Sequence, residues 1–146
     1  MKLQKILIVE DSELLHRMYE VVFQQYRFKH GVLLHALNGK EALDILAQHP
    51  DVDLILLDIN MPVMSGLAFL QFCQSQQVFR QIPVIVVSTE GKREDTLRAI
   101  KCGARGYVTK PFKPSDLHAL IDRIFGVTDA VEAHALTAGA AVLSHG

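Results

Sequence analysis

The chain has 146 residues, 49% hydrophobic and 21% charged, which suits one well-buried domain and is too short for two ordinary ones. Because 15 Lys and Arg residues stand against 16 Asp and Glu residues, the net charge of −1 disfavours direct binding to nucleic acid or to an acidic membrane. The apolar runs are far shorter than the roughly 18 residues of a membrane helix, and no secretory signal pattern opens the chain. We therefore expect a cytoplasmic protein.

The first part of the chain alternates strand and helix patterns. The apolar, β-branched residues 5–9 predict a buried strand that stops at Glu10 and Asp11. Ser12 is a good N-cap, and apolar residues at three-and-four spacing predict an amphipathic helix after it: Leu14, Leu15, Met18, Tyr19, Val22, Phe23 and Tyr26. Residues 32–37 predict a second strand before Asn38-Gly39, and the apolar residues of 42–46 predict a helix that ends before Pro50.

The same alternation continues through the middle of the chain. Residues 52–57 form a continuous apolar run that predicts a third strand ending at Asp58. After a turn at Met61-Pro62, a third helix carries apolar residues at Leu67, Phe69, Leu70 and Phe72. Residues 83–87 predict a fourth strand that ends at Ser88 and Thr89.

One more helix, strand and helix follow. Residues 92–102 predict a fourth helix that stops at Gly103, and a short strand around residues 107–108 ends at Lys110-Pro111. Pro114 suits the first turn of a fifth helix with an apolar face made of Leu117, Leu120, Ile121, Ile124 and Phe125.

Five strands alternating with five helices indicate an α/β protein, a doubly wound five-stranded parallel sheet covered by helices on both faces. We assign residues 1–125 to this domain. Residues 126–146 contain no Lys or Arg and lack a long apolar stripe, so they predict a tail or linker with a short helix as one option.

The residues that end the strands carry the chemistry. In an open parallel sheet, ligands bind at the carboxyl ends of the strands, which here gather three carboxylates, two hydroxyls and one ammonium: Glu10, Asp11, Asp58, Ser88, Thr89 and Lys110. Three neighbouring carboxylates repel one another unless a cation lies between them, and their hard oxygens favour Mg²⁺, with Mn²⁺ as an alternative. A Mg²⁺ with few protein ligands, a lysine and hydroxyl groups together predict a site for a phosphoryl group.

Each of these residues also has an ordinary structural interpretation. Asp11 and the hydroxyls of Ser88 and Thr89 could only cap the next helix, Asp58 could form a turn, and Lys110 could be a surface lysine. Their joint occurrence at four strand ends favours the functional interpretation.

Residues 4–125 resemble the receiver domain of two-component response regulators, with CheY-like single-domain members as the most similar type. The motifs that carry the resemblance are Val9-Glu10-Asp11-Ser12, Leu57-Asp58-Ile59-Asn60-Met61-Pro62 with Gly66, Val87-Ser88-Thr89, and Gly106-Tyr107-Val108-Thr109-Lys110-Pro111-Phe112. The resemblance implies the flavodoxin-like, CheY-like (βα)5 fold with strand order 2-1-3-4-5.

The resemblance also implies a role for each matching residue. Asp58 is the expected phosphoacceptor, and Glu10 and Asp11 are the acidic pair that holds Mg²⁺ together with Asp58 and the backbone carbonyl of Asn60. Ser88 matches the switch hydroxyl, and Lys110 matches the phosphate-binding lysine, with Ser88 and Thr89 beside it. Tyr107 matches the aromatic residue whose rotamer reports phosphorylation, although an aromatic residue on a short edge strand also serves plain packing.

Two positions depart from the commonest family pattern. Thr89 stands where Ala or Gly is more usual, which predicts restricted access to Asp58, and Glu10 replaces the more frequent Asp, which favours a water-mediated contact to the metal. Outside these motifs, Cys73 and Cys102 lack a CxxC pattern and predict reduced thiols. The 7 histidines show no metal-ligand spacing, so we expect solvated or capping roles.

The expected function is therefore that of a receiver, not an enzyme acting on a separate substrate. Its expected partners are a histidine kinase or histidine phosphotransfer protein and a downstream protein, or a second copy, bound through the face of the fourth helix, fifth strand and fifth helix. Alternatives are a receiver portion of a longer regulator, a phosphate sink in a phosphorelay, and a phosphatase with an aspartyl-phosphate. Such a phosphatase requires an Asp-x-Asp motif after the first strand, whereas a flavodoxin requires a glycine- and hydroxyl-rich loop there. This chain has Glu10-Asp11 at that position, which disfavours both classes.

Overall fold

The computed structural model describes residues 3–26, 30–61, 63–89, 91–126 and 140–142. The elements in these ranges are β1 (Leu3–Val9), α1 (Glu13–Gln24), β2 (His30–Ala36), α2 (Gly39–Gln48), β3 (Leu54–Asp58), α3 (Gly66–Ser75), β4 (Val84–Thr89), α4 (Arg93–Lys101), β5 (Gly106–Lys110), α5 (Pro114–Ile124) and β6 (Ala140–Val142). The alternation of five strands with five helices is confirmed, and β6 is added to it. None of the described helices is long and apolar enough to cross a membrane.

The strands form one sheet in the order β2-β1-β3-β4-β5-β6. Each neighbouring pair from β2 to β5 is parallel, which confirms the strand order 2-1-3-4-5, whereas β6 runs antiparallel to β5. The chain moves from β1 to β2 on one side and then returns to β3 on the other side of β1. The ends of β1 and β3 therefore flank the topological switch point, where open α/β sheets bind ligands.

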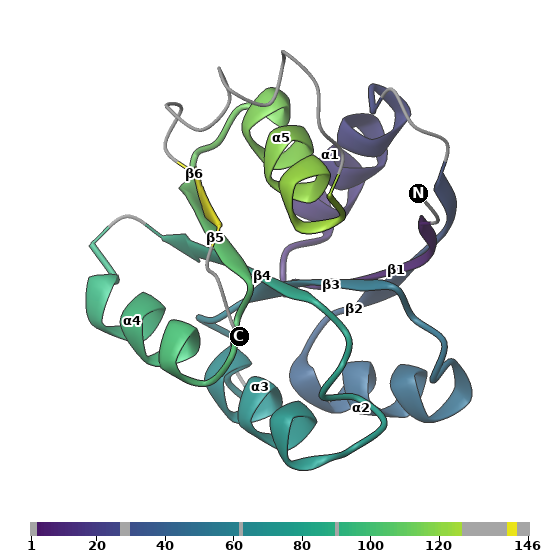
Figure 1. Ribbon diagram of the computed structural model, residues 1–146, viewed down its shortest axis with the longest axis vertical. Helices are drawn as coiled ribbons and strands as arrows, with labels where there is room; N and C mark the ends of the chain where they lie inside the picture. The colour runs from purple at the N-terminus through teal and green to yellow at the C-terminus, as the bar shows by residue number, and fades with distance from the viewer. Residues whose placement is uncertain (1–2, 27–29, 62, 90, 127–139, 143–146) are drawn as a thin grey trace.

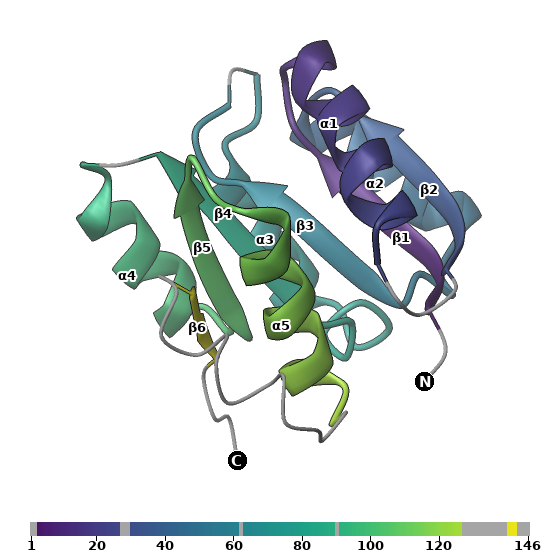
Figure 2. The same ribbon diagram turned by 90° about the horizontal axis from the view of Figure 1, so that it is seen from above.

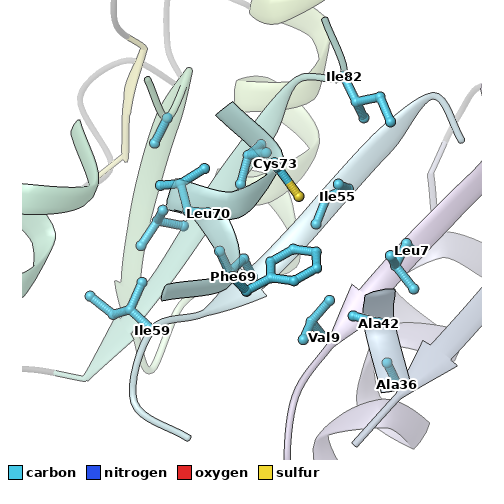
Figure 3. Packing of buried hydrophobic residues seen from close by; sticks show 14 of the residues in the cluster. Leu7, Val9, Ala36, Ala42, Ile55, Ile59, Phe69, Leu70, Cys73 and Ile82 are labelled. Atoms are coloured by element: carbon cyan, nitrogen blue, oxygen red, sulfur yellow. The ribbon is translucent and has the colours of Figure 1, made fainter. Parts of the chain in front are cut away.

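Helices cover both faces of the sheet, with α1 and α5 on one face and α2, α3 and α4 on the other (Figure 1). Successive strand residues point to opposite faces, so Ile6 and Ile8 of β1 pack in the cluster with α1 and α5. Leu7 and Val9 belong to the opposite cluster, where Phe69 and Leu70 of α3 meet the sheet (Figure 3). Burial on both faces explains why the strands are continuous apolar runs.

The strands differ from the predicted ranges by one or two residues at one or both ends, as β2 and β3 illustrate. β2 begins two residues before the predicted 32–37 and ends one residue earlier, and β3 begins at Leu54 instead of residue 52. Val52 is buried, but its N–H donates to the carbonyl of His49 in a turn. An apolar residue buried in a turn continues the apolar run of the strand after it, so the sequence pattern does not mark the boundary.

Two apolar residues assigned to helix faces lie in solvent. Leu14 of α1 is 73% exposed and Phe72 of α3 is 40% exposed. Leu14 and Phe72 each lie beside the row of buried residues on their helix. In α1 this row includes Tyr19, Val22 and Phe23. The sheet buries a narrower arc of each helix than the apolar residues occupy. Cys73 is buried on α3, and both Cys73 and Cys102 are free thiols as expected.

The C-terminal segment contributes a strand and no described helix. Residues 140–142 pair with β5 in antiparallel register, with Ala141 opposite Tyr107. The sequence predicts a tail or linker with a short helix as one option for residues 126–146, and the described part adds a strand at the edge of the sheet (Figure 2). Residues 127–139 and 143–146 lie outside the described residues.

Candidate functional site

The strand ends named by the sequence meet at one edge of the sheet. Strand pairing places Val9 opposite Leu57, Asp58 opposite Val87, and Thr89 opposite Lys110. The residues that end β1, β3, β4 and β5 thus lie in neighbouring strands at the switch point. The structure therefore places every predicted strand-end residue at this edge, and it brings Glu10, Asp11, Asp58 and Lys110 into one cluster.

Three carboxylates form a cluster at this edge. One oxygen from each of Glu10, Asp11 and Asp58 lies within 4.8 Å of the other two. Glu10 and Asp58 are 2% and 3% exposed, whereas Asp11 lies in solvent. Two buried carboxylates and one at the rim leave the cluster open to a ligand from solvent on the side of Asp11.

Backbone and side-chain donors hold the two buried carboxylates. The N–H of Ser12 donates to Glu10 Oε2 over 3.0 Å, and the N–H of Asn60 donates to Asp58 Oδ1 over 3.0 Å. Lys110 Nζ lies 2.7 Å from Glu10 Oε1 and 3.4 Å from Asp58 Oδ2. The lysine therefore bridges the first strand end and the third.

The negative charges of the three clustered carboxylates outnumber the one positive charge of Lys110. A hydrogen bond with the Glu10 side chain, burial, and the negative charge of Glu10 raise the pKa of Asp11 above its usual value. Burial alone would lower the pKa of Lys110, but its hydrogen bond to Glu10 and the charge of Asp58 outweigh this and raise it. One ammonium faces three carboxylates, so a further cation would relieve the repulsion.

The donor set fits a hard divalent cation beside a phosphoryl group. All three clustered side chains offer carboxylate oxygens, which Mg²⁺ and Mn²⁺ prefer. In addition, the side-chain Nδ2 of Asn60 is a buried donor without a partner among the described residues. A buried donor left unpaired costs about 1–3 kcal/mol, and a phosphoryl oxygen is an acceptor of the kind it lacks.

The sequence model of the response regulator receiver domain matches residues 6–122 of this chain. The chain belongs to the response regulator receiver family. Among relatives, a chemotaxis protein CheY homolog of Campylobacter jejuni is 33% identical over 122 residues, covering 84% of this chain and 92% of that protein. The chemotaxis protein CheY1 of Helicobacter pylori is 31% identical over 125 residues, which is 86% of this chain and 99% of that protein.

Solved structures agree with this membership. The CheY4 chemotaxis protein of Vibrio cholerae has a TM-score of 0.70 at 28% identity, covering 86% of this chain and 99% of that chain. The receiver domain of a histidine kinase from Syntrophus aciditrophicus has a TM-score of 0.73 at 32% identity, covering 87% of this chain and 96% of that chain. The chain is thus a CheY-like receiver domain in sequence and in fold. Receiver domains bind Mg²⁺ in general, and the acidic cluster of this chain could hold a metal.

The two predicted switch residues of this receiver line one cavity. Ser88, which is 2% exposed, and Tyr107 border a cavity of about 350 Å³ between β4, β5 and α4. Thr96, Leu97 and Ile100 of α4 form another part of its wall. Thr89 also lines the cavity and is exposed at its rim, beside the strand end of Lys110. Tyr107 therefore borders the open space between β5 and α4.

One residue of the receiver site was missed by sequence analysis. His16 is buried, and its Nε2 lies 2.6 Å from the backbone carbonyl oxygen of Glu10. The expectation of a solvated or capping histidine is wrong here, because His16 lies on the buried face of α1, against the end of β1. Its partner His35 is 19 residues away in the sequence, on β2, so no local spacing marks the pair.

Proposed function

We propose that this receiver accepts a phosphoryl group from a histidine kinase or histidine phosphotransfer protein on Asp58. The observation that carries the proposal is the position of Asp58, which is buried at the end of β3 among Glu10, Asp11 and Lys110. Among the described residues, this is the one group of three or more His, Cys, Asp or Glu side chains that could hold a metal ion.

The proposed reaction is an in-line transfer to a carboxylate. An oxygen of Asp58 attacks phosphorus, a P–O bond forms, and the P–N bond of the phosphohistidine donor breaks with its electron pair left on the imidazole. Mg²⁺ or Mn²⁺, held by Glu10, Asp11, Asp58 and the backbone carbonyl of Asn60, would offset the negative charge of the phosphoryl oxygens. Lys110, already 3.4 Å from Asp58 Oδ2, donates to one of those oxygens.

The acceptor is a side chain of the protein itself. The receiver therefore promotes only its own phosphorylation and, with water as the attacking group, its own dephosphorylation. It turns over no separate small substrate in this proposal. Glu10 and Asp58 are pre-positioned by the Ser12 and Asn60 amides, so the site needs little reorganisation when the phosphoryl group arrives.

The added phosphoryl group would change the surface between α4 and β5. Its oxygens draw the hydroxyl of Ser88 inward, and Tyr107 rotates into the cavity that both residues line. We propose that a downstream protein or a second copy binds this altered face, formed by α4, β5 and α5. Because β6 already pairs with the outer edge of β5, a partner reaches this face through α4 or displaces β6.

Exposed basic residues on and before α4 indicate the charge of that partner: Lys92, Arg93, Arg98 and Lys101. Only Arg98 is near a carboxylate on the same helix, with Asp95 at 4.0 Å, among the described ion pairs. An acidic partner surface would complement the remaining charges and accelerate association.

A second arrangement is favoured by one relative. The phosphate regulon transcriptional regulatory protein PhoB of Klebsiella pneumoniae is 36% identical over 121 residues, which cover 83% of this chain but 51% of that protein. The same receiver chemistry would then control a further domain of a longer regulator.

Phosphorylation of Asp58 is tested with acetyl phosphate and Mg²⁺, followed by intact-protein mass spectrometry. We expect the wild type to gain one phosphoryl group and Asp58→Asn to gain none, because an amide is not a nucleophile of this kind. Asp44→Asn, at an exposed carboxylate of α2, is the matched control and should be labelled like the wild type. Full labelling of Asp58→Asn would contradict the proposal.

A further inference from the structure

A chain of hydrogen bonds links the acidic cluster to the surface of α1. His16 Nε2 lies 2.6 Å from the carbonyl oxygen of Glu10, and His16 Nδ1 lies 2.7 Å from Nδ1 of His35 on β2. His35 Nε2 lies 2.8 Å from Oε1 of Glu20, which is on α1 and exposed. The relay formed by His16, His35 and Glu20 thus connects α1, β2 and the end of β1, which are adjacent in the fold (Figure 2).

The donor and acceptor roles in this relay are constrained at both ends. A carbonyl oxygen and a carboxylate can only accept, so Nε2 of His16 and Nε2 of His35 both carry hydrogen. The contact between the two Nδ1 atoms then needs one hydrogen between them, so the two rings together hold three hydrogens, one more than two neutral imidazoles carry. Every ring nitrogen is engaged, and neither ring can turn over without losing a hydrogen bond. The relay therefore holds the imidazole of His16 in one orientation.

The group that His16 holds is the peptide joining Glu10 and Asp11. The N–H of Glu10 already donates to the carbonyl of Ala36 at the end of β2 over 3.0 Å. The hydrogen bond from His16 fixes the carbonyl on the other side of Glu10. Because a peptide unit is planar, fixing this oxygen also fixes the backbone nitrogen of Asp11. The backbone of Glu10 and Asp11 at the end of β1 is then held in one orientation.

We propose that His16 and His35 are positioning residues for the acidic cluster, with Glu20 as the outer anchor of the relay. His16 orients the Glu10–Asp11 peptide, and His35 orients His16. The inference rests on the proposed function, because the orientation of Glu10 and Asp11 matters for the reaction through the metal they hold. Groups that orient metal ligands from outside typically contribute about 10–100-fold to metal affinity.

The test is a Mg²⁺ titration of the full chain, followed by the amide signals around Asp58 in NMR spectra. We expect His35→Ala to raise the Mg²⁺ dissociation constant about 10-fold, the lower end of what such orienting groups contribute. His35→Gln keeps a side-chain donor for Nδ1 of His16 and should restore most of the affinity. His49→Ala is the matched control, because His49 is also a histidine that contacts a residue of β1. Its Nδ1 lies 3.1 Å from Nζ of Lys5, which is outside the site. This variant should titrate like the wild type.

A second readout needs neither metal nor phosphorylation. Without Mg²⁺, the amide signals of Glu10 and Asp11 should shift in His35→Ala and stay unchanged in His49→Ala. If His35→Ala does not fold, Glu20→Ala frees the outer end of the relay at an exposed position and should move the same signals in the same direction.

Two results would overturn the relay. One is wild-type Mg²⁺ affinity together with unmoved Glu10 and Asp11 signals in His35→Ala and Glu20→Ala. The other is equal weakening by His49→Ala, which would show a general loss of stability. A wild type that does not respond to Mg²⁺, while the metal-free signals still shift in His35→Ala, would instead contradict the proposed function and leave the relay intact.

Discussion

At the scale of single residues, the backbone around the proposed phosphoacceptor Asp58 depends on a glycine that carries no functional group. Gly66 is the first residue of α3, and a Cβ atom added there would lie 2.2 Å from the carbonyl oxygen of Asp58 and 2.5 Å from Cα of Ile59. Both contacts are to backbone, which cannot rotate away. Only a residue without a side chain allows α3 to start this close to the end of β3.

We predict that Gly66→Ala lowers the free energy of unfolding by about 1–3 kcal/mol, because overpacking shifts the backbone of Asp58 and Ile59. The same shift should slow labelling of Asp58 by acetyl phosphate. Urea unfolding and mass spectrometry measure the two effects.

Gly39→Ala is the matched control, because Gly39 is likewise the first residue of its helix, α2. A Cβ at Gly39 would meet Cγ and Sδ of Met64 at 2.8 and 2.9 Å. The Met64 side chain is flexible and can move, so we expect a change under about 1 kcal/mol. Equal effects of both substitutions would contradict the prediction.

At the scale of elements, polar contacts join α5 to α1 and to the residues just after α1, across one face of the sheet. The hydroxyl of Tyr26 donates to Asp122 Oδ1 over 2.5 Å, and His118 Nε2 lies 2.7 Å from the carbonyl oxygen of Val22. Burial lowers the pKa of His118, although the hydrogen bond to Val22 and the charge of Asp122 partly offset it. The neutral imidazole is therefore the form that the folded protein favours.

We predict that this contact makes stability depend on pH. As the pH decreases below 6.5, the ordinary histidine pKa, His118 is protonated in the unfolded chain at a higher pH than in the folded protein. The free energy of unfolding therefore decreases with decreasing pH, until the pH is below the lowered pKa of the folded protein. Partial exposure keeps the effect under about 1 kcal/mol. His118→Gln keeps a donor for Val22 without titrating, and should lose less stability than the wild type between about pH 7.5 and pH 5.5 in urea unfolding. Identical losses in both proteins would show that His118 contributes nothing.

The strand β6 is a second feature at this scale. It covers the outer edge of β5, whose backbone groups would otherwise be unpaired and open to another strand. We predict that truncation after Gly126 accelerates hydrogen exchange of β5 amides and increases self-association, measured by exchange NMR and analytical ultracentrifugation. The full chain is the reference. Unchanged exchange and unchanged sedimentation would show that β6 does not protect this edge in solution.

At the scale of the whole molecule, the sheet separates the reacting group from the proposed signalling face. Asp58 lies at the end of β3, whereas Tyr107 lies two strands away on β5, and β4 with Ser88 stands between them. In the proposed mechanism, a change at Asp58 would reach α4 through one intervening strand and the cavity beside Tyr107.

We predict that loading the site with Mg²⁺ and beryllium fluoride, a mimic of the acyl phosphate, changes amide signals of α4 and Tyr107. A ligand shifts such an equilibrium only by its differential affinity for the two states, so a partner that binds the loaded form should also stabilise it. Asp58→Asn treated in the same way is the control and should show no change in α4. Changes confined to the Asp58 pocket would favour a phosphate sink.

Much of the site could be predicted because its residues stand at the ends of locally encoded strands. Glu10, Asp11, Asp58, Ser88 and Lys110 each follow an apolar run, and parallel strands bring their carboxyl ends to one edge whatever the details of packing. Residue order along the chain was therefore enough to predict that these groups meet. Their individual roles in phosphoryl transfer stay predictions until the variants are measured.

The tertiary structure alone decided which distant residues touch. His16 and His35 have no shared spacing, Gly66 has no side chain to mark its contact with Asp58, and β6 is too short to show a strand pattern. The exposure of Leu14 likewise depends on how much of α1 the sheet covers. Hydrophobic periodicity predicts whether a segment is a helix or a strand and which of its faces is buried. Contacts between segments depend on how the segments are placed in space, and no local pattern contains that information.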